Sequence, residues 1–137
     1  MQTLFEKPGI TIMYDMVTKW LYVTWRGEHD DESSLAGCVT ILNKIRQTKS
    51  NKILNDSSQV LDGWSEVVRW IGQEFFQALA DEGVIAIAWV MAHDWPARAD
   101  INKVVGYTTR PIVDTFEDIE SAYNWLRAVP DKPSHEI

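Results

Sequence analysis

Bulky and polar side chains alternate along two early segments, residues 10–15 and 20–25. A period of two is typical of strands that bury one face, and the intervening MVTK is short enough to close a β-hairpin. The segment NKILN at 51–55 predicts a further short strand. The segment VIAIAWVMA at 84–92 has no polar side, so it predicts a central strand that is covered on both faces.

Apolar residues recur at helical spacing between these strands. The acidic stretch from Asp30 to Ser33 supplies a cap and a first turn for one helix. That helix carries, at helical spacing, Leu35, Cys38, Val39, Leu42 and Ile45, and Cys38 is expected to point inward. Further helices are predicted from about Trp64 to Asp81, over a short segment capped by Asp94, and over residues 117–129.

The segment VVGYTT at 104–109 predicts a strand, and IVDTF at 112–116 predicts a final strand or an edge extension. The predicted order is β-β-α-β-α-β-α-β-α. Single strands separated by helices imply right-handed crossovers, so we expect an α/β fold with helices packed on a mixed sheet of about four to six strands. No linker or repeat interrupts this order, so residues 1–137 form a single predicted domain. Its last residues, about 130–137, are expected to form a flexible tail.

Composition and charge argue against several classes of function. The chain of 137 residues has a net charge of -7 and no two adjacent basic residues, which argues against a nucleic-acid partner. No apolar run reaches the length of a membrane span, and a single cysteine favours a cytoplasmic protein. The three histidines, His29, His93 and His135, are isolated, so no metal site is expected. No cofactor motif is present either.

The opening hairpin, the strand running into NDSS, the helix ending at Gly83 and the closing DTFEDIESAYNWLR together resemble the STAS/SEC14 group of small bacterial domains. Those domains are similar to the sporulation anti-sigma-factor antagonist, and the resemblance covers nearly the whole chain. It implies a STAS/SEC14-like fold. In phosphorylated antagonists, a partner kinase modifies a serine that follows an aspartate at the end of this strand. Asp56 and Ser57 match that arrangement, whereas Gln59 stands where a glycine is usual.

The stretch NDSS has two interpretations. Asparagine, aspartate and serine satisfy free backbone N–H groups at turns and caps, so the stretch fits a polar turn that leads into the next helix. Alternatively, Asp56, Ser57 and Ser58 form a switch or a polar contact. This interpretation rests on their place after a strand, because α/β sheets bind ligands at the carboxyl ends of their strands.

A second polar group follows the apolar strand at 84–92 and shares the predicted rim with NDSS. It consists of His93, Asp94, Trp95 and Arg98. A histidine beside a carboxylate can act as a general base, and an arginine can hold an anionic group. A small enzyme that uses His93 and Asp94 in a pocket at this rim is therefore the alternative function.

Aromatic residues on the helix that begins near Trp64 widen its apolar face. At about 100° per residue, Trp70 and Phe76 lie about 120° to either side of the inward stripe. Either neighbouring helices cover these flanks, or the flanks form, with Trp64 and Trp95, a ligand or partner surface, for which a homodimer is the simplest case. The first predicted function is thus a non-catalytic cytoplasmic domain that binds a regulatory protein partner or a small apolar or anionic ligand.

Overall fold

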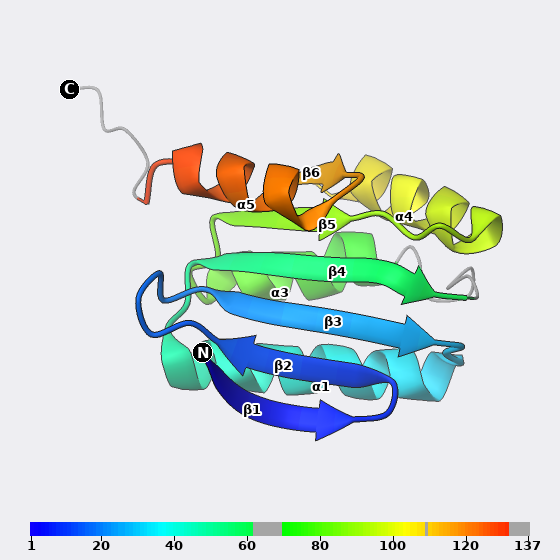
Figure 1. The fold of residues 1–137 in the computed structure, drawn as a ribbon, viewed down its shortest axis with the longest axis horizontal. Coiled ribbons are helices and arrows are strands. Elements are labelled where there is room, and N and C mark those ends of the chain that lie inside the picture. The colour runs from blue at the N-terminus through cyan, green and yellow to red at the C-terminus, as the bar shows by residue number, and fades with distance from the viewer. Residues whose placement is uncertain (62–69, 109, 132–137) are drawn as a thin grey trace.

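The strands of the described part of the chain form one mixed sheet of six strands (Figure 1). The computed structural model describes residues 1–61, 70–108 and 110–131, so most of the predicted tail lies outside it. The sheet order follows the sequence. Antiparallel pairing joins β1 (Gln2–Lys7), β2 (Ile10–Tyr14) and β3 (Leu21–Gly27). Parallel pairing from β3 onward adds β4 (Lys52–Val60), β5 (Ala86–Val90) and β6 (Ile112–Phe116).

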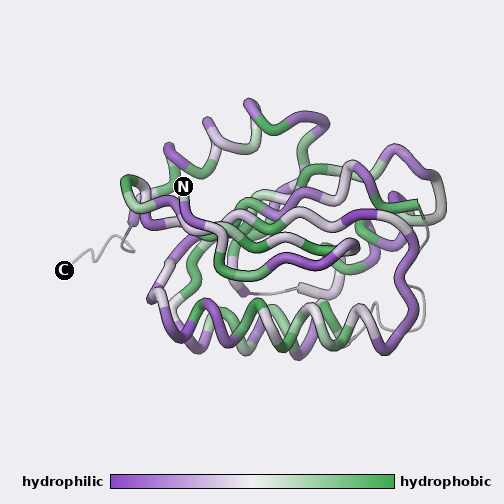
Figure 2. The backbone as a smooth tube through the Cα atoms, turned by 60° about the horizontal axis from the view of Figure 1, so that its bottom comes forward, coloured by the Kyte–Doolittle hydropathy of each residue, from purple (hydrophilic) through white to green (hydrophobic). Residues whose placement is uncertain are grey.

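Helices lie on both sides of this sheet, as Figure 2 shows. The back face is covered by α1 (Asp31–Thr48), the π-helix η1 (Ile71–Phe75) with α3 (Phe76–Asp81), and α4 (Trp95–Tyr107). These helices share one side because each links two parallel neighbouring strands through a crossover of the same hand. The front face carries α5 (Ile119–Ala128), which packs on β4, β5 and β6. The predicted α/β class with a mixed sheet is confirmed.

Local signals predicted several elements correctly. Asp30 caps α1, since its side chain accepts a hydrogen bond from Ser33 N at 2.8 Å. Cys38 points inward as expected, and burial raises the pKa of its thiol. The stripe of inward-facing residues on α1 is narrower than predicted: Leu35 and Val39, which were expected to lie in it, are 37% and 55% exposed. All five residues of β5 are buried, in agreement with its uninterrupted apolar sequence.

Two elements differ from the prediction. The strand β1 was not expected. Its pairing with β2 shifts between Thr3 and Phe5, and this bulge breaks the alternation that identifies a strand. The segment 104–109 is not a strand, because α4 extends to Tyr107. Val104 is completely buried against the back-face core, one helical turn after Ile101, so packing overrides the strand preference of the two valines.

One glycine fixes how closely α1 approaches the sheet. A Cβ atom on Gly37 would lie 2.4 Å from Cη2 of Trp25 in β3. We expect Gly37→Ala to lower the free energy of unfolding by about 1–3 kcal/mol, because the core cannot accept the extra methyl group. Urea unfolding measures this loss. The matched variant is Gly106→Ala in α4, where a Cβ meets no atom within 4 Å. That variant should be neutral or stabilise the protein, and an equal loss in both variants would contradict the close approach.

Candidate functional site

The polar stretch NDSS lies inside β4, which continues to Val60. The prediction that it forms a turn is therefore wrong. Its side chains alternate between the two faces of the sheet, as strand geometry requires. Asn55 and Ser57 point to the back face, and Asp56 points to the front face, where Leu54 packs with α5. Ser58 lies in a bulge, since the pairing of β3 with β4 steps from Asp56 to Gln59.

The two back-face side chains accept hydrogen bonds from buried indoles. Trp25 Nε1 donates to Asn55 Oδ1 at 2.9 Å, and Trp89 Nε1 donates to Ser57 Oγ at 2.8 Å. Ser57 is completely buried. Buried indole N–H groups need acceptors, and β4 supplies them from between β3 and β5. The sequence feature that indicates these hydrogen bonds is the pair of tryptophans at inward positions of predicted strands, rather than the polar stretch alone.

Asp56 occupies the front face in one row with Thr24 of β3 and Val90 of β5. Its side chain is nearly buried, since the residue is only 6% exposed. Oδ1 accepts a hydrogen bond from Ser58 N at 2.9 Å. The pairing of β3 with β4 shifts beside this bond, after Thr24, so the carboxylate stabilises an irregular stretch of β4. Ser58 is half-buried beside it.

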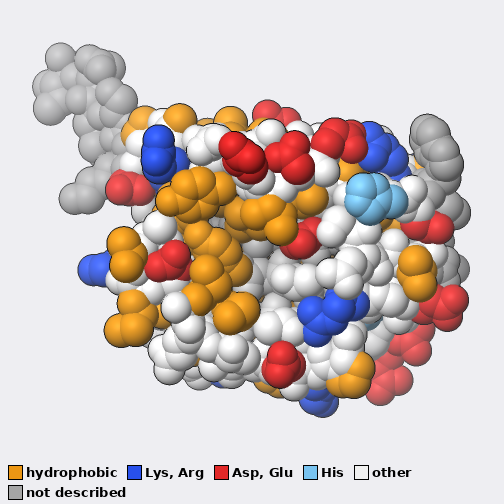
Figure 3. All heavy atoms as spheres, viewed as in Figure 1, with side chains coloured by type: hydrophobic (Ala, Val, Ile, Leu, Met, Phe, Trp, Pro, Cys, Tyr) orange, Lys and Arg blue, Asp and Glu red, His pale blue; other side chains and the backbone are white. Residues whose placement is uncertain are grey.

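No helix of the described residues lies over half of the front face. Figure 1 shows β1, β2 and β3 uncovered, while α5 lies over the later strands. We call this half, together with the adjoining Asp56 of β4, the open front face; register places on it Thr3, Glu6, Thr11, Met13, Tyr22 and Thr24. Figure 3 shows hydrophobic side chains gathered beside α5 and a hollow in the middle of this side of the molecule.

Aromatic rings connect the open front face to α5. The Trp20 ring lies 6.4 Å from that of Tyr22 and 5.3 Å from that of Tyr123, measured between centroids. Burial raises the pKa of the Tyr22 phenol, and the nearby carboxylate of Asp15 acts in the same direction. Tyr22 therefore presents a neutral aromatic side chain next to the row that contains Asp56.

The polar group after β5 does not converge on one point. Asp94 caps α4 and accepts a hydrogen bond from Ala97 N at 3.4 Å. Arg98 pairs with Glu117, which lowers the pKa of that carboxyl group. His93 is exposed, and no hydrogen bond joins it to Asp94 in the described part of the chain. Trp95 begins α4, but its side chain lies outside the described part. Among the described side chains, this arrangement supplies no hydrogen-bonded pair of a general acid and a general base.

The predicted aromatic flanks have different environments. Trp64 lies outside the described residues. Trp70 is half-buried, and its ring stacks on Phe75 at 6.0 Å. Phe76 is 3% exposed and meets Trp89 edge-on, so its predicted place on an outer flank is wrong. The π-helix η1 turns through fewer degrees per residue than an α-helix, so angles counted from Trp64 do not hold beyond it.

A small cavity separates α1 and η1 from the sheet. Its volume is about 20 Å³, which is room for about one water molecule. Among the residues that line it are Trp25, Ser34, Asn55, Phe75 and Trp89. Ser34 Oγ is buried without a hydrogen-bond partner among the described residues. The cavity therefore suits a bound water molecule that satisfies this hydroxyl group, and it is too small for an organic ligand.

A larger open groove of about 450 Å³ lies between the β1–β2 turn and the start of α1. His29 lines it, but both imidazole nitrogens have partners. Nδ1 lies 3.1 Å from Ser33 Oγ, and Nε2 lies 3.1 Å from Gly9 O. Through these hydrogen bonds, His29 links the β1–β2 turn to the start of α1. No three histidine, cysteine, aspartate or glutamate side chains of the described residues come together as a metal site.

Comparison with known proteins supports the fold and goes no further. No protein-family model matches the chain, and no curated protein matches it. A solved structure that is similar is an uncharacterised protein of the DUF3478 family from Shewanella loihica PV-4, described as having a SpoIIAA-like fold. The two chains are 17% identical with a TM-score of 0.58, and the match covers 89% of this chain and 97% of the other. The chain therefore has a SpoIIAA-like fold, which confirms the fold implied by its resemblance to the STAS/SEC14 group.

Proposed function

We propose that this protein is a non-catalytic cytoplasmic binding or regulatory domain that recognises a small ligand or a protein partner on its open front face. The observation that carries the proposal is the hollow beside α5, on the face where Asp56 is nearly buried in the row next to Tyr22. Asp56 and Tyr22 both belong to strands, so their positions are set by the sheet rather than by loops.

Location supports this assignment. Asp56, at the middle of β4, pairs with Val90 at the carboxyl end of β5, and Ser58 follows in the carboxyl-terminal half of β4. Ligands generally bind at the carboxyl ends of strands in α/β sheets. The open front face beside Asp56 also carries the half-buried side chains of Met13 and Tyr22. Apolar side chains with a few polar groups among them are typical of binding sites.

The non-catalytic part of the proposal rests on how the titratable groups are used. Asp94 holds the start of α4, Arg98 is paired with Glu117, and His29 links two segments. A general base needs a partner that orients it or a substrate within reach, and these side chains are committed to local structure. Of the side chains predicted at this rim, His93 has no hydrogen bond to a described residue and is the candidate for the alternative enzyme function.

A protein partner, including a second copy of the chain, fits the same face. Met16 and Val17, in the turn between β2 and β3, are 69% and 90% exposed. Large apolar side chains exposed beside a half-buried sheet face are typical of interfaces. The face therefore serves either form of recognition, and the molecular mass of the native protein distinguishes them.

The test is native mass spectrometry of freshly purified protein, with the denatured chain of 15.7 kDa as reference. We expect additional mass from a retained small molecule or a second chain. Thr24→Trp, which fills the open front face, should remove that mass. Asn43→Trp, on the exposed side of α1, should retain it. A native mass equal to one bare chain, or additional mass that survives Thr24→Trp, would contradict the proposal.

A further inference from the structure

We propose that Asp56 is the anchoring carboxylate of a binding site for a small organic ammonium ion on the open front face. This inference rests on the proposed binding function and specifies the chemistry of the ligand. It replaces the anionic ligand considered from the sequence, since a carboxylate at the base of the site repels anions.

Burial of Asp56 is the first argument. The residue is 6% exposed, and one hydrogen bond to its side chain is described, from Ser58 N to Oδ1. No ion pair joins it to any basic side chain in the described ranges. An ionised carboxylate withdrawn from water is costly unless a cation or several donors compensate it. A ligand ammonium group would supply the missing cation.

The basic side chains on the same strands already form hydrogen bonds to other residues. Arg26, two residues after Thr24 on β3, donates to Thr11 Oγ1 at 2.6 Å and to Lys7 O at 3.2 Å. Lys52 shares the front face of β4 with Asp56, but its Nζ donates to Leu126 O at 2.6 Å. Neither forms an ion pair with Asp56, so the negative charge on the open front face stays available to a ligand.

Aromatic side chains define the rest of the ligand. Tyr22 lies two residues before Thr24, about 7 Å along β3 from the row of Asp56. Its ring stacks with that of Trp20, which in turn contacts that of Tyr123, so aromatic side chains continue along the front face beyond the row of Asp56. Ring faces attract cations and cover alkyl groups. The fitting ligand is therefore an ammonium group on a short apolar body.

The charge of the whole protein favours the same class. A net charge of -7 raises the local concentration of cations at the surface and lowers that of anions. The Asp56 carboxylate then selects among those cations, because its hydrogen bond to an ammonium group is charge-assisted.

The competing explanation is that Asp56 only stabilises the irregular stretch of β4 through its bond from Ser58 N. Asp56→Asn separates the two roles. An asparagine retains the Oδ1 acceptor and the shape of the side chain but removes the charge. The variant should therefore unfold at the same or a higher urea concentration than the parent protein, because an uncompensated buried charge is removed, and it should bind the ammonium ion more weakly.

The experiment is an NMR titration of backbone amides with n-butylammonium chloride, using n-butanol as the uncharged match. We expect n-butylammonium to shift the amides of Thr24, Asp56 and Ser58, and to bind about tenfold more weakly to Asp56→Asn. Asp114→Asn is the control, because it removes an exposed carboxylate from the same face of the sheet, on β6. It should bind n-butylammonium like the parent protein.

Three results would overturn the inference. Equal binding of n-butanol and n-butylammonium at these amides would remove the ammonium preference while leaving recognition on the open front face in place. Equal binding of n-butylammonium by Asp56→Asn and the parent would show that Asp56 is only structural. Shifts confined to the groove near His29, or no shifts with either compound, would refute the ammonium site and also count against the open front face as a ligand site.

Discussion

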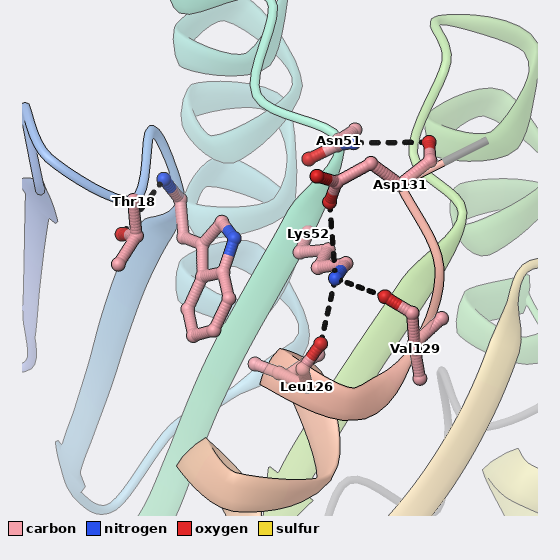
Figure 4. A network of polar contacts seen from close by, with 7 residues as sticks. Thr18, Asn51, Lys52, Leu126, Val129 and Asp131 are labelled. Carbon is pink, nitrogen blue, oxygen red and sulfur yellow. Dashed lines mark hydrogen bonds and ion pairs between the residues drawn. The ribbon is translucent and has the colours of Figure 1, made fainter.

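Lys52→Met is expected to lower the free energy of unfolding by about 3 kcal/mol, measured by urea denaturation. Lys52 is 1% exposed, although it is a lysine. Figure 4 shows its ammonium group between β4 and the end of α5. Nζ donates to Leu126 O at 2.6 Å and also to Val129 O, and it lies 3.1 Å from Asp131 Oδ1.

The physical reason for this loss of stability is the contact between Lys52 and the end of α5. The last carbonyl groups of a helix have no intrahelical partners and carry a partial negative charge. Lys52 supplies a positively charged donor to these carbonyls from inside the sheet, and its Nζ also lies 5.4 Å from the centre of the Trp20 ring. Methionine fills the volume of the lysine stem but donates nothing, so two carbonyls lose a charge-assisted bond.

Two controls define the effect. Lys103→Met replaces an exposed lysine of α4 and should change stability by less than about 0.5 kcal/mol. Asp131→Asn removes a partner whose side chain is 75% exposed, so it should cost less than about 1 kcal/mol. Hydrogen exchange of the α5 amides should accelerate in Lys52→Met beyond the change in the other helices. A loss below about 1 kcal/mol, or unchanged exchange in α5, would contradict this account.

Elements governed by local chemistry were predicted well from the sequence. The caps Asp30 and Asp94 act as expected, because a cap bonds to residues two or three positions away. The apolar sequence of β5 identified a strand buried on both faces. In each case the information lies within one element and its immediate neighbours.

The errors arise where distant residues decide the structure. NDSS resembles a turn until the partners of Asn55 and Ser57 are known, and those partners are indoles from two other strands. The Phe76 position depends on a π-helix that no spacing rule indicates. For the site, the sequence supplied Asp56 and Ser58 as candidates, but the face on which each lies requires the register of β4. The position of Tyr22 next to the row of Asp56 was not predicted from the sequence either, because it depends on how the strands pair.

Ser57→Asp is expected to destabilise the protein by about 3 kcal/mol or more, whereas Ser58→Asp should cost less than about 1 kcal/mol. Ser57 is completely buried on the back face and accepts the indole N–H of Trp89. An aspartate there places an unpaired charge in the core. Ser58 is half-buried, so an added carboxylate there reaches water. Thermal or urea unfolding of the two variants, which differ by one position, measures the contrast.

The same contrast bears on regulation, because a phosphate is a larger anion than a carboxylate. Because Ser57 is completely buried on the back face, its modification would require the back-face helices to move away from the sheet. Modification of Ser58 would add charge next to Asp56 on an intact fold. Ser57→Ala separates the lost hydrogen bond, expected to cost about 1 kcal/mol, from the added charge. If Ser57→Asp instead unfolds at the same temperature or urea concentration as the parent protein, Ser57 is accessible in solution and its buried position in β4 is refuted.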